Sequence, residues 1–463
     1  MRRFLSPPTF GQVLGCLSIL GLVVLSFLAG AVVMSFQLPT SEFLDKAFAG
    51  ARAWHERGRS DTPSHARGEG TGSEKVRVDR ADKTYDGFTL YTATPGSRAT
   101  LIDMRGEVVH QWELPFSRAW PRPPHVRDPM PDEQIHWFRC HLYPNGDLLA
   151  IYHTELDTPY GYGLVKLNKD SQLLWAYAGN VHHDIDVAED GTLYTLSQKI
   201  ESKPPEGMEF LPSPYIADSL VVLSPEGREV KNIPIVEAFR NSPFARMAAL
   251  IIGGSSPLAI SPPPGVRPPP TLVALSPVGP SGQLTWKGDF LHANSVKVLS
   301  RALAPKFPLF KAGQVLISLR NLDALAVVDT RLRSVVWAAQ GIWRIQHDPE
   351  FLENGHLLLY DNAGSPRGCR ILEYDPVTQA IPWAYDNENS TPFSPYYRGT
   401  KQRLPNGNTL IVDPDNARLL EVTKGKELVW ELFCPGNITA LNGARRYGPR
   451  ELTFLNGIAR PRP

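Results

Sequence analysis

Three histidines recur at equivalent places in this chain of 463 residues. His183, His292 and His347 each follow a tryptophan that ends an apolar segment, and His183 and His347 both lie eight residues before a glycine. Imidazole titrates near neutral pH, so it can act as a nucleophile, an acid or a base. One histidine in such a place is often a packed structural residue. Three in register favour a common pocket.

The elements that must position these histidines are visible as an internal repeat. Six segments end in tryptophan after a turn and an apolar strand, and these are IDMRGEVVHQW to Trp112, LNKDSQLLW to Trp175, LSPVGPSGQLTW to Trp286, VDTRLRSVVW to Trp337, YDPVTQAIPW to Trp383 and VTKGKELVW to Trp430. A second repeated element places an NG or DG turn before an apolar strand, as in YPNGDLLAIY, EDGTLYTL, ENGHLLLYDN and PNGNTLIVD. Such dipeptides between apolar runs are strong hairpin signals.

One inner hairpin and one outer hairpin closing on tryptophan make a four-stranded antiparallel unit. Radial repetition of that unit predicts an all-β, six-bladed β-propeller over residues 85–463, with seven blades as the alternative. The three histidines come just after outer strands, where the chain returns to begin an innermost strand. Innermost strands line the axial channel of a propeller, so we expect the histidines to meet near the axis.

One blade is expected to be interrupted by an inserted segment at about residues 235–285. An apolar stretch with helical spacing, roughly Ile235 to Ile252, precedes the proline-rich run SPPPGVRPPP, which favours extended backbone. A lid or flank over the site and a spacer without chemical role are equally compatible with this pattern.

The N-terminal segment has the pattern of a membrane anchor. Residues 13–36 carry no charge and are long enough to span a hydrocarbon core of about 30 Å. Arg2 and Arg3 precede them, so we expect a cytoplasmic tail at 1–12 and a body on the periplasmic, extracytoplasmic side of the inner membrane. A cleaved signal peptide is the alternative, because Ala29-Gly30-Ala31 resembles a cleavage site.

Residues 37–84 are expected to form an amphipathic helix, from Thr40 to Trp54, followed by a flexible tether rich in Gly, Ser, Arg and His. The balance of 48 Lys and Arg against 47 Asp and Glu argues against a nucleic-acid partner. The oligomeric state is left open by the sequence. So is the state of three cysteines outside the apolar span, among which one disulfide at most can form; these are Cys140, Cys369 and Cys434.

Five motifs, in order along the chain, resemble the bacterial arylsulfate sulfotransferase family. They are HHDIDVAEDGTLY (182–194), DFLHANSV (289–296), LISLRN (316–321), QHDPEFLENGHLLLYDN (346–362) and RLPNGNTLI (403–411). The resemblance covers roughly Tyr85 to Pro435. It implies a six-bladed periplasmic propeller that moves a sulfuryl group from a phenolic sulfate to another phenol, without the nucleotide sulfate donor of cytosolic enzymes.

By this resemblance His347 matches the histidine that becomes sulfated. Arg320, His292 and His183 match catalytic residues around the transferring sulfate, whereas Asn294 and His182 are expected to bind substrate. No metal and no cofactor is implied, and the sequence contains no EF-hand loop or HExxH motif. Asp184 and Asp348 read as acceptors in turns rather than as metal ligands.

These residue types suit sulfuryl transfer on chemical grounds. A neutral imidazole can carry a labile covalent intermediate, while a guanidinium, an amide and protonated imidazoles can stabilise charge on sulfonate oxygens. The anchor, the tether and the proline-rich insertion depart from the well-characterised periplasmic enzymes, as does the lack of a neighbouring cysteine pair. Two rival functions stay open: a non-catalytic binding or scaffold propeller, and a propeller hydrolase or quinone-dependent dehydrogenase with acidic calcium ligands near the axis.

Overall fold

The computed structural model of the chain describes residues 26, 76–209, 213–247, 288–365, 368–386, 393, 398–457 and 461–462. All of these except Ser26 belong to one compact unit, and Ser26 belongs to a second unit made of residues 1–69 and 280–282. The predicted membrane span, the helix expected at 40–54 and most of the expected insertion lie outside the described residues. Within the described ranges no helix is long and apolar enough to cross a membrane.

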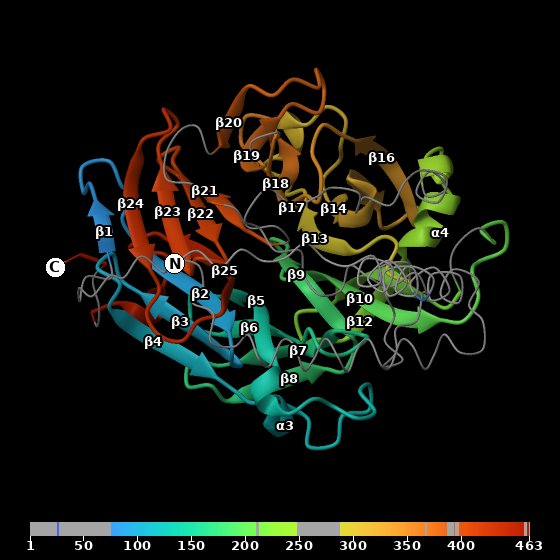
Figure 1. The fold of residues 1–463 in the computed structure, drawn as a ribbon, viewed down its shortest axis with the longest axis horizontal. Helices are drawn as coiled ribbons and strands as arrows, with labels where there is room; N and C mark the ends of the chain where they lie inside the picture. The colour runs from blue at the N-terminus through green and yellow to red at the C-terminus, as the bar shows by residue number, and fades with distance from the viewer. Residues whose placement is uncertain are drawn as a thin grey trace, which may run out of the picture. The chain divides into compact units, whose positions relative to one another are not determined.

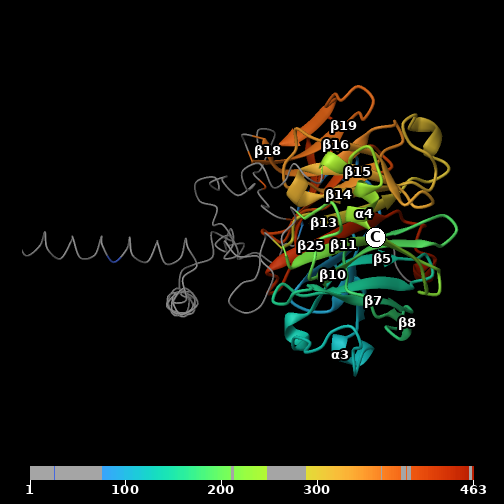
Figure 2. The same ribbon diagram turned by 90° about the vertical axis from the view of Figure 1, so that its right-hand side faces the viewer.

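The described part of the chain forms six antiparallel sheets arranged around one axis (Figure 1). From the innermost strand outwards they are β25 (Ala440–Tyr447), β2 (Phe88–Thr94), β3 (Arg98–Ile102), β4 (Val108–Glu113); β5 (His136–Leu142), β6 (Leu148–His153), β7 (Gly161–Leu167), β8 (Leu173–Tyr177); β9 (Val181–Val187), β10 (Leu193–Glu201), β11 (Tyr215–Leu223), β12 (Glu229–Pro234); β13 (Ala293–Val298), β14 (Val315–Leu319), β15 (Ala324–Asp329), β16 (Ser334–Gln340); β17 (His347–Phe351), β18 (Leu357–Ser365), β19 (Gly368–Tyr374), β20 (Trp383–Asp386); β21 (Lys401–Arg403), β22 (Thr409–Asp413), β23 (Arg418–Val422) and β24 (Leu428–Phe433). The all-β, six-bladed propeller predicted from the repeats is therefore confirmed. In the side view, β7 and β8 lie opposite β18 and β19, with β13 and β25 between them (Figure 2).

Short helical turns connect the strands. They are α3 (Phe116–Ala119), α4 (Ile235–Arg240) and the 3-10 turns η1 (Asp132–Gln134), η4 (Ala304–Lys306), η5 (Arg320–Leu322) and η6 (Thr453–Leu455). Five of the six repeat tryptophans lie on the outermost strands β4, β8, β16, β20 and β24.

The third blade corrects one part of the sequence analysis. Its outermost strand is β12, which contains no tryptophan, and Trp286 lies outside the described residues. The blade is therefore complete before Ile235, so the insertion follows a blade instead of interrupting it. The hairpin turn before β12 ends at Gly227, whose positive φ of 78° suits a glycine, but β12 itself buries little and gives a weak strand signal.

The folded body also begins earlier than the predicted boundary at Tyr85. A short strand, β1 (Val76–Asp79), pairs antiparallel with β24 and extends that blade to five strands. Only four residues long, with two of them exposed, it does not stand out from the polar stretch before it. At the other end of the chain, β25 pairs with β2 from Phe88 to Thr94, so the last blade element closes the ring against the first.

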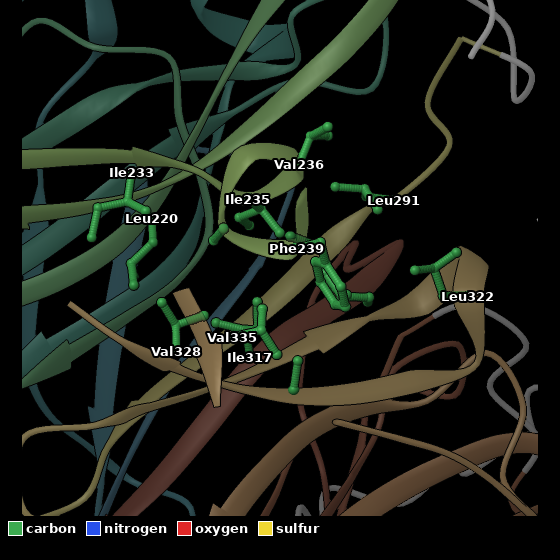
Figure 3. Packing of buried hydrophobic residues seen from close by; sticks show 14 of the residues in the cluster. Leu220, Ile233, Ile235, Val236, Phe239, Leu291, Ile317, Leu322, Val328 and Val335 are labelled. Carbon is green, nitrogen blue, oxygen red and sulfur yellow. The ribbon is translucent and has the colours of Figure 1, made fainter. Parts of the chain in front are cut away.

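Apolar residues fill the space between neighbouring blades. In the largest cluster, Ile235, Val236 and Phe239 of α4 pack with residues from β11, β14 and β15 between the third and fourth blades (Figure 3). The same cluster contains Leu291 and Leu322, which adjoin His292 and Arg320 in sequence. Rigid packing thus fixes the backbone on which these two polar side chains stand.

The innermost strands are irregular at one common level. Register shifts occur where β5, β9, β13, β17 and β25 pair with the next strand of their blade. Such bulges re-aim side chains and raise local twist. His183 and His292 have positive φ values of 59° and 48°, a conformation that non-glycine residues rarely adopt.

Below these bulges, charged side chains of alternating sign cross the axis. Asp184 on β9 pairs with Arg139 on β5 at 3.7 Å and with Lys297 on β13 at 2.7 Å. Asp348 on β17 pairs with Lys297 at 3.8 Å and with Lys401 on β21 at 3.4 Å. We refer to Arg139, Asp184, Lys297, Asp348 and Lys401 as the axial girdle.

The sixth innermost strand, β25, joins the axial girdle through its backbone. The Arg139 guanidinium donates a hydrogen bond to the carbonyl of Asn442. A Cβ at Gly443 would collide with that guanidinium, so the glycine leaves the room that Arg139 needs. All six innermost strands are thereby tied together at one level.

Candidate active site

His347 is the first residue of β17 and is 5% exposed. Its Nδ1 lies 2.9 Å from the carbonyl oxygen of Ile345 and 2.8 Å from Oδ1 of Asn362. The Asn362 side-chain NH₂ donates to the carbonyl of Arg398 at 2.7 Å, which fixes Oδ1 toward His347. Both neighbours of Nδ1 are acceptors, so Nδ1 carries the proton and Nε2 has a free lone pair.

The surroundings keep this imidazole neutral. Burial, followed by the positive charge of Arg320, lowers the pKa of His347 to about 3, although the hydrogen bond to Asn362 acts in the opposite direction. A neutral imidazole with Nδ1 protonated is the form that can attack an electrophile through Nε2. Hydrogen bonding and burial therefore prepare His347 as a nucleophile.

Arg320 and His292 lie on the neighbouring blade. Arg320 begins η5, directly after β14, and its backbone N–H donates to the carbonyl of His292 at 3.1 Å. His292 Nδ1 lies 2.5 Å from Oδ2 of Asp289. Burial alone would raise the pKa of Asp289, but His292 and Arg320 hold it below its ordinary value. The site therefore contains a fixed cation beside a histidine backed by a carboxylate.

His183 approaches His292 from the third blade, with ring centroids 4.9 Å apart. Burial and the neighbouring histidines lower the pKa of His183 well below its ordinary value. His182 lies behind it, fully buried, with Nδ1 2.8 Å from Nδ1 of His183 and Nε2 3.4 Å from Oδ1 of Asp218. His182 was expected to bind substrate, but this placement puts it one layer behind the histidine that faces the site.

Asn294 is also more deeply placed than expected. Its side-chain NH₂ donates to the backbone carbonyl of Gln346 at 2.9 Å, and it is 2% exposed. Gln346 in turn donates to Ser318 Oγ at 3.1 Å and to the carbonyl of Ala324 at 2.9 Å. These bonds join the fourth and fifth blades directly beside His347. The structure thus gives Asn294 a role in holding the backbone of the predicted nucleophile.

Several residues near the site were not found by sequence analysis. An aromatic cluster lies beside His183: His153 at 5.7 Å, Tyr160 at 5.3 Å and Phe138 at 5.2 Å between ring centroids. His136 faces His153 at 5.4 Å. A usable signal was the pairing of two histidines at the ends of neighbouring apolar strands, since His136 and His153 are opposite each other in β5 and β6. Asp218 carries its own signal, as a single acid in the apolar strand YIADSLVVL.

The axial girdle closes the channel beneath these residues. On it lies a cavity of about 90 Å³ lined by charged and polar groups of all six innermost strands, among them His141, Glu350 and Arg445. Within the described ranges no three His, Cys, Asp or Glu side chains are grouped to hold a metal ion. Cys140, Cys369 and Cys434 are all free thiols. Asp184 accepts hydrogen bonds from Ser295 and Lys297, so it is an acceptor within the floor of the site.

Fold and site together define a six-bladed β-propeller with a histidine- and arginine-lined centre. A family model described as Arylsulfotransferase (ASST) matches residues 139–434, which is more than half of the chain. The protein belongs to the arylsulfotransferase family, as the motifs suggested. At the level of the family it is therefore a sulfotransferase.

Comparison with solved structures found propellers of low identity. A protein of unknown function from Bacteroides caccae is 10% identical, with a TM-score of 0.46, covering 77% of this chain and 98% of its own. A catalytically inactive virginiamycin B lyase from Staphylococcus aureus is 8% identical, with a TM-score of 0.37, covering 78% of this chain and 89% of its own. No curated protein matches the chain.

Proposed function

We propose that the protein transfers a sulfuryl group from an aryl sulfate donor to a phenolic acceptor, in two steps, through a sulfohistidine at His347. The observation that carries this proposal is the free lone pair on His347 Nε2, which follows from the two acceptors at Nδ1. Membership of the arylsulfotransferase family supports the same reaction class.

In the first step, Nε2 of His347 attacks the sulfur of the aryl sulfate. The N–S bond forms, the S–O bond to the aryl group breaks, and the electron pair leaves with the phenolate. The sulfated ring keeps its Nδ1 proton and is therefore an imidazolium. The acceptors at Ile345 and Asn362 hold that proton and disperse the positive charge.

In the second step, the oxygen of the acceptor phenol attacks the sulfur, and the N–S bond breaks. Imidazolium is a good leaving group because neutral imidazole is restored, and the low pKa of His347 makes its departure easier. The acceptor must lose its proton during this step. His183 and His292, both facing the site as imidazoles, are the bases within reach.

Arg320 supplies the fixed positive charge that both steps need. Sulfuryl transfer leaves negative charge on the sulfonate oxygens and on the departing phenolate. A planar guanidinium can bind two such oxygens at once, which an ammonium cannot. Its charge also acts on the pKa values of His347 and His292, consistent with a position among the reacting groups.

The test is mass spectrometry of protein mixed with a chromogenic aryl sulfate in the absence of acceptor. We expect one sulfuryl group on the peptide containing His347 and its loss when phenol is added. His347→Ala should abolish both labelling and turnover. His110→Ala is the matched control, because His110 lies on the outermost strand β4 and bonds only to the carbonyl of Lys169. A label on a different residue, or full turnover in His347→Ala, would refute the mechanism.

A further inference from the structure

We infer that Asp218, His182 and His183 form a proton relay that takes up the proton of the acceptor phenol; the inference rests on the proposed function. The three side chains are in line. His183 Nδ1 lies 2.8 Å from His182 Nδ1, and His182 Nε2 lies 3.4 Å from Asp218 Oδ1. His183 alone of the three contacts the other histidine that faces the site.

The contact between two Nδ1 atoms constrains the protons. At 2.8 Å it must hold one proton, because two lone pairs or two N–H groups would repel. When His183 donates, its Nε2 has a free lone pair, and His182 places its remaining N–H toward Asp218. When His182 donates instead, His183 carries its proton on Nε2. The pair thus has one basic and one acidic form.

The carboxylate decides where positive charge can rest. His182 and Asp218 are 0% and 1% exposed, and neither His182 Nε2 nor Asp218 Oδ1 has another hydrogen-bond partner within the described part of the chain. Asp218 is held in place by the backbone N–H of Ala293, which donates to Oδ2 at 2.9 Å. A buried carboxylate stabilises a cation beside it and is poorly accommodated without one.

The proton transfer then balances without leaving a cation at the site. The phenol O–H bond breaks, and an N–H bond forms at Nε2 of His183. Simultaneously the Nδ1–H bond of His183 breaks and an Nδ1–H bond forms on His182. The products are a phenolate-like oxygen bonded to sulfur, neutral His183, and an imidazolium at His182 paired with Asp218.

This displacement of charge answers a difficulty of the site. A positive charge on His183 itself would lie among groups that disfavour it, since burial and the neighbouring histidines lower its pKa. The titratable and charged groups around the relay are His153, His292, His347, Tyr160, Asp289 and Arg320. Moving the charge to His182 places it against Asp218, away from most of them.

The kinetic test uses Asp218→Asn in the full-length protein and phenols of increasing acidity as acceptors. Loss of a general base should slow desulfation by an ordinary phenol about 100-fold or more. With a strongly acidic nitrophenol, which is already ionised at neutral pH, the loss should shrink to below about threefold. The burst of phenolate released by the donor alone should be preserved.

A matched control separates chemistry from structural damage. Asp413→Asn removes another fully buried carboxylate, one that pairs with Arg418 on the blade of β21–β24, far along the chain from the relay. Any slowing in this variant should be equal for all acceptors. If Asp218→Asn also slows all acceptors equally, the relay is wrong and Asp218 only supports the fold.

A second measurement does not depend on turnover. Long-range proton–nitrogen NMR correlations of histidine-labelled wild-type protein should show a proton on Nε2 of His182, none on Nε2 of His183, and one proton shared between the two Nδ1 atoms. Asp218→Asn should change the form of His182. If both histidines carry protons on Nδ1 or on neither, the relay is refuted. Failure of the proposed function would show differently, as an absence of sulfated His347 in the wild type.

Discussion

At His347 the protonation state is set by hydrogen bonds and burial together. The carbonyl of Ile345 and Oδ1 of Asn362 fix the proton on Nδ1, and burial keeps the ring neutral. Asn362 is itself fixed by the carbonyl of Arg398. A chain of neutral groups therefore orients the nucleophile without placing a carboxylate beside it, which would compete with an anionic substrate.

Asn362→Leu tests that orientation. Without Oδ1, the imidazolium of the sulfated enzyme loses one of its two acceptors, and hydrogen bonds to charged groups contribute about 1.5–3 kcal/mol. We expect the burst rate with an aryl sulfate donor to fall about 10- to 150-fold, with little change in KM. Stopped-flow measurement of phenolate release gives both quantities. A changed KM with an unchanged burst rate would mean that Asn362 binds substrate instead.

Residue spacing alone could bring His183, His292 and His347 to one place, because each begins an innermost strand. It could not rank them. The tautomer of His347 depends on Asn362, a partner on the next strand, and the depth of His182 depends on Asp218, a partner two strands away in the same sheet. Such partners are set by register, which one sequence does not reveal where strands are bulged.

At the scale of elements, the bulged innermost strands perform two tasks at once. In the sequence HHD, the positive φ of His183 lets this residue face the site while Asp184 turns into the axial girdle. In QHD, His347 and Asp348 divide in the same way, with Asp348 at a φ of 49°. Motifs that pair a histidine with an aspartate thus join catalysis to ring closure.

Lys297→Met tests the axial girdle. Lys297 pairs with both Asp184 and Asp348, and its removal leaves two buried carboxylates without their shared cation. Breaking a buried ion pair in this way costs about 3–5 kcal/mol of unfolding free energy. Urea denaturation measures the cost. The control is Lys169→Met, whose ammonium pairs with Asp170 on the surface and should change stability by less than about 0.5 kcal/mol. Equal effects of the two substitutions would contradict a structural role for the girdle.

The repeat pattern predicted most elements because turns and tryptophans mark both ends of a blade. It failed at β12, where no tryptophan ends the blade, and at β1, which adds a fifth strand to the last sheet. Both are outermost strands with little buried surface. Their position is decided by pairing with the neighbouring strand, which leaves little trace in local composition.

At the scale of the whole molecule, buried neutral histidines make stability depend on pH. Burial lowers the pKa values of His136, His141 and His347 to about 3, whereas in the unfolded chain they are about 6.5. Between these values the unfolded state binds more protons, so the unfolding free energy falls as the pH falls. Each histidine contributes up to about 1.4 kcal/mol per pH unit.

We therefore expect a marked loss of unfolding free energy between pH 7.5 and pH 5.5, measured by urea denaturation at each pH. The stability should return when the pH is raised. His141→Asn should reduce the pH slope, because His141 is remote from the proposed chemistry and lies at the axial cavity. A stability that does not change over this range would show that the histidines are protonated in the folded protein.

For the N-terminal region we propose one membrane span at residues 13–36, with the propeller on the extracytoplasmic side, on the basis of the uncharged run and Arg2 and Arg3 before it. Protease added to spheroplasts should then digest the propeller while a cytoplasmic marker protein survives. Full protection of the propeller would refute this orientation. Recovery of the propeller in the soluble periplasmic fraction would favour a cleaved signal peptide.

The pairing of β25 with β2 has a consequence for how the protein is made. Their partners lie roughly 350 residues apart, and β25 follows every other described strand in the chain. Until it emerges, the first blade lacks its innermost strand, Arg139 lacks the Asn442 carbonyl, and the ring has an open edge of the kind that promotes aggregation. Closure over so long a separation is slow. Activity should therefore appear only when synthesis has passed Tyr447, although all of the histidines of the site are present long before.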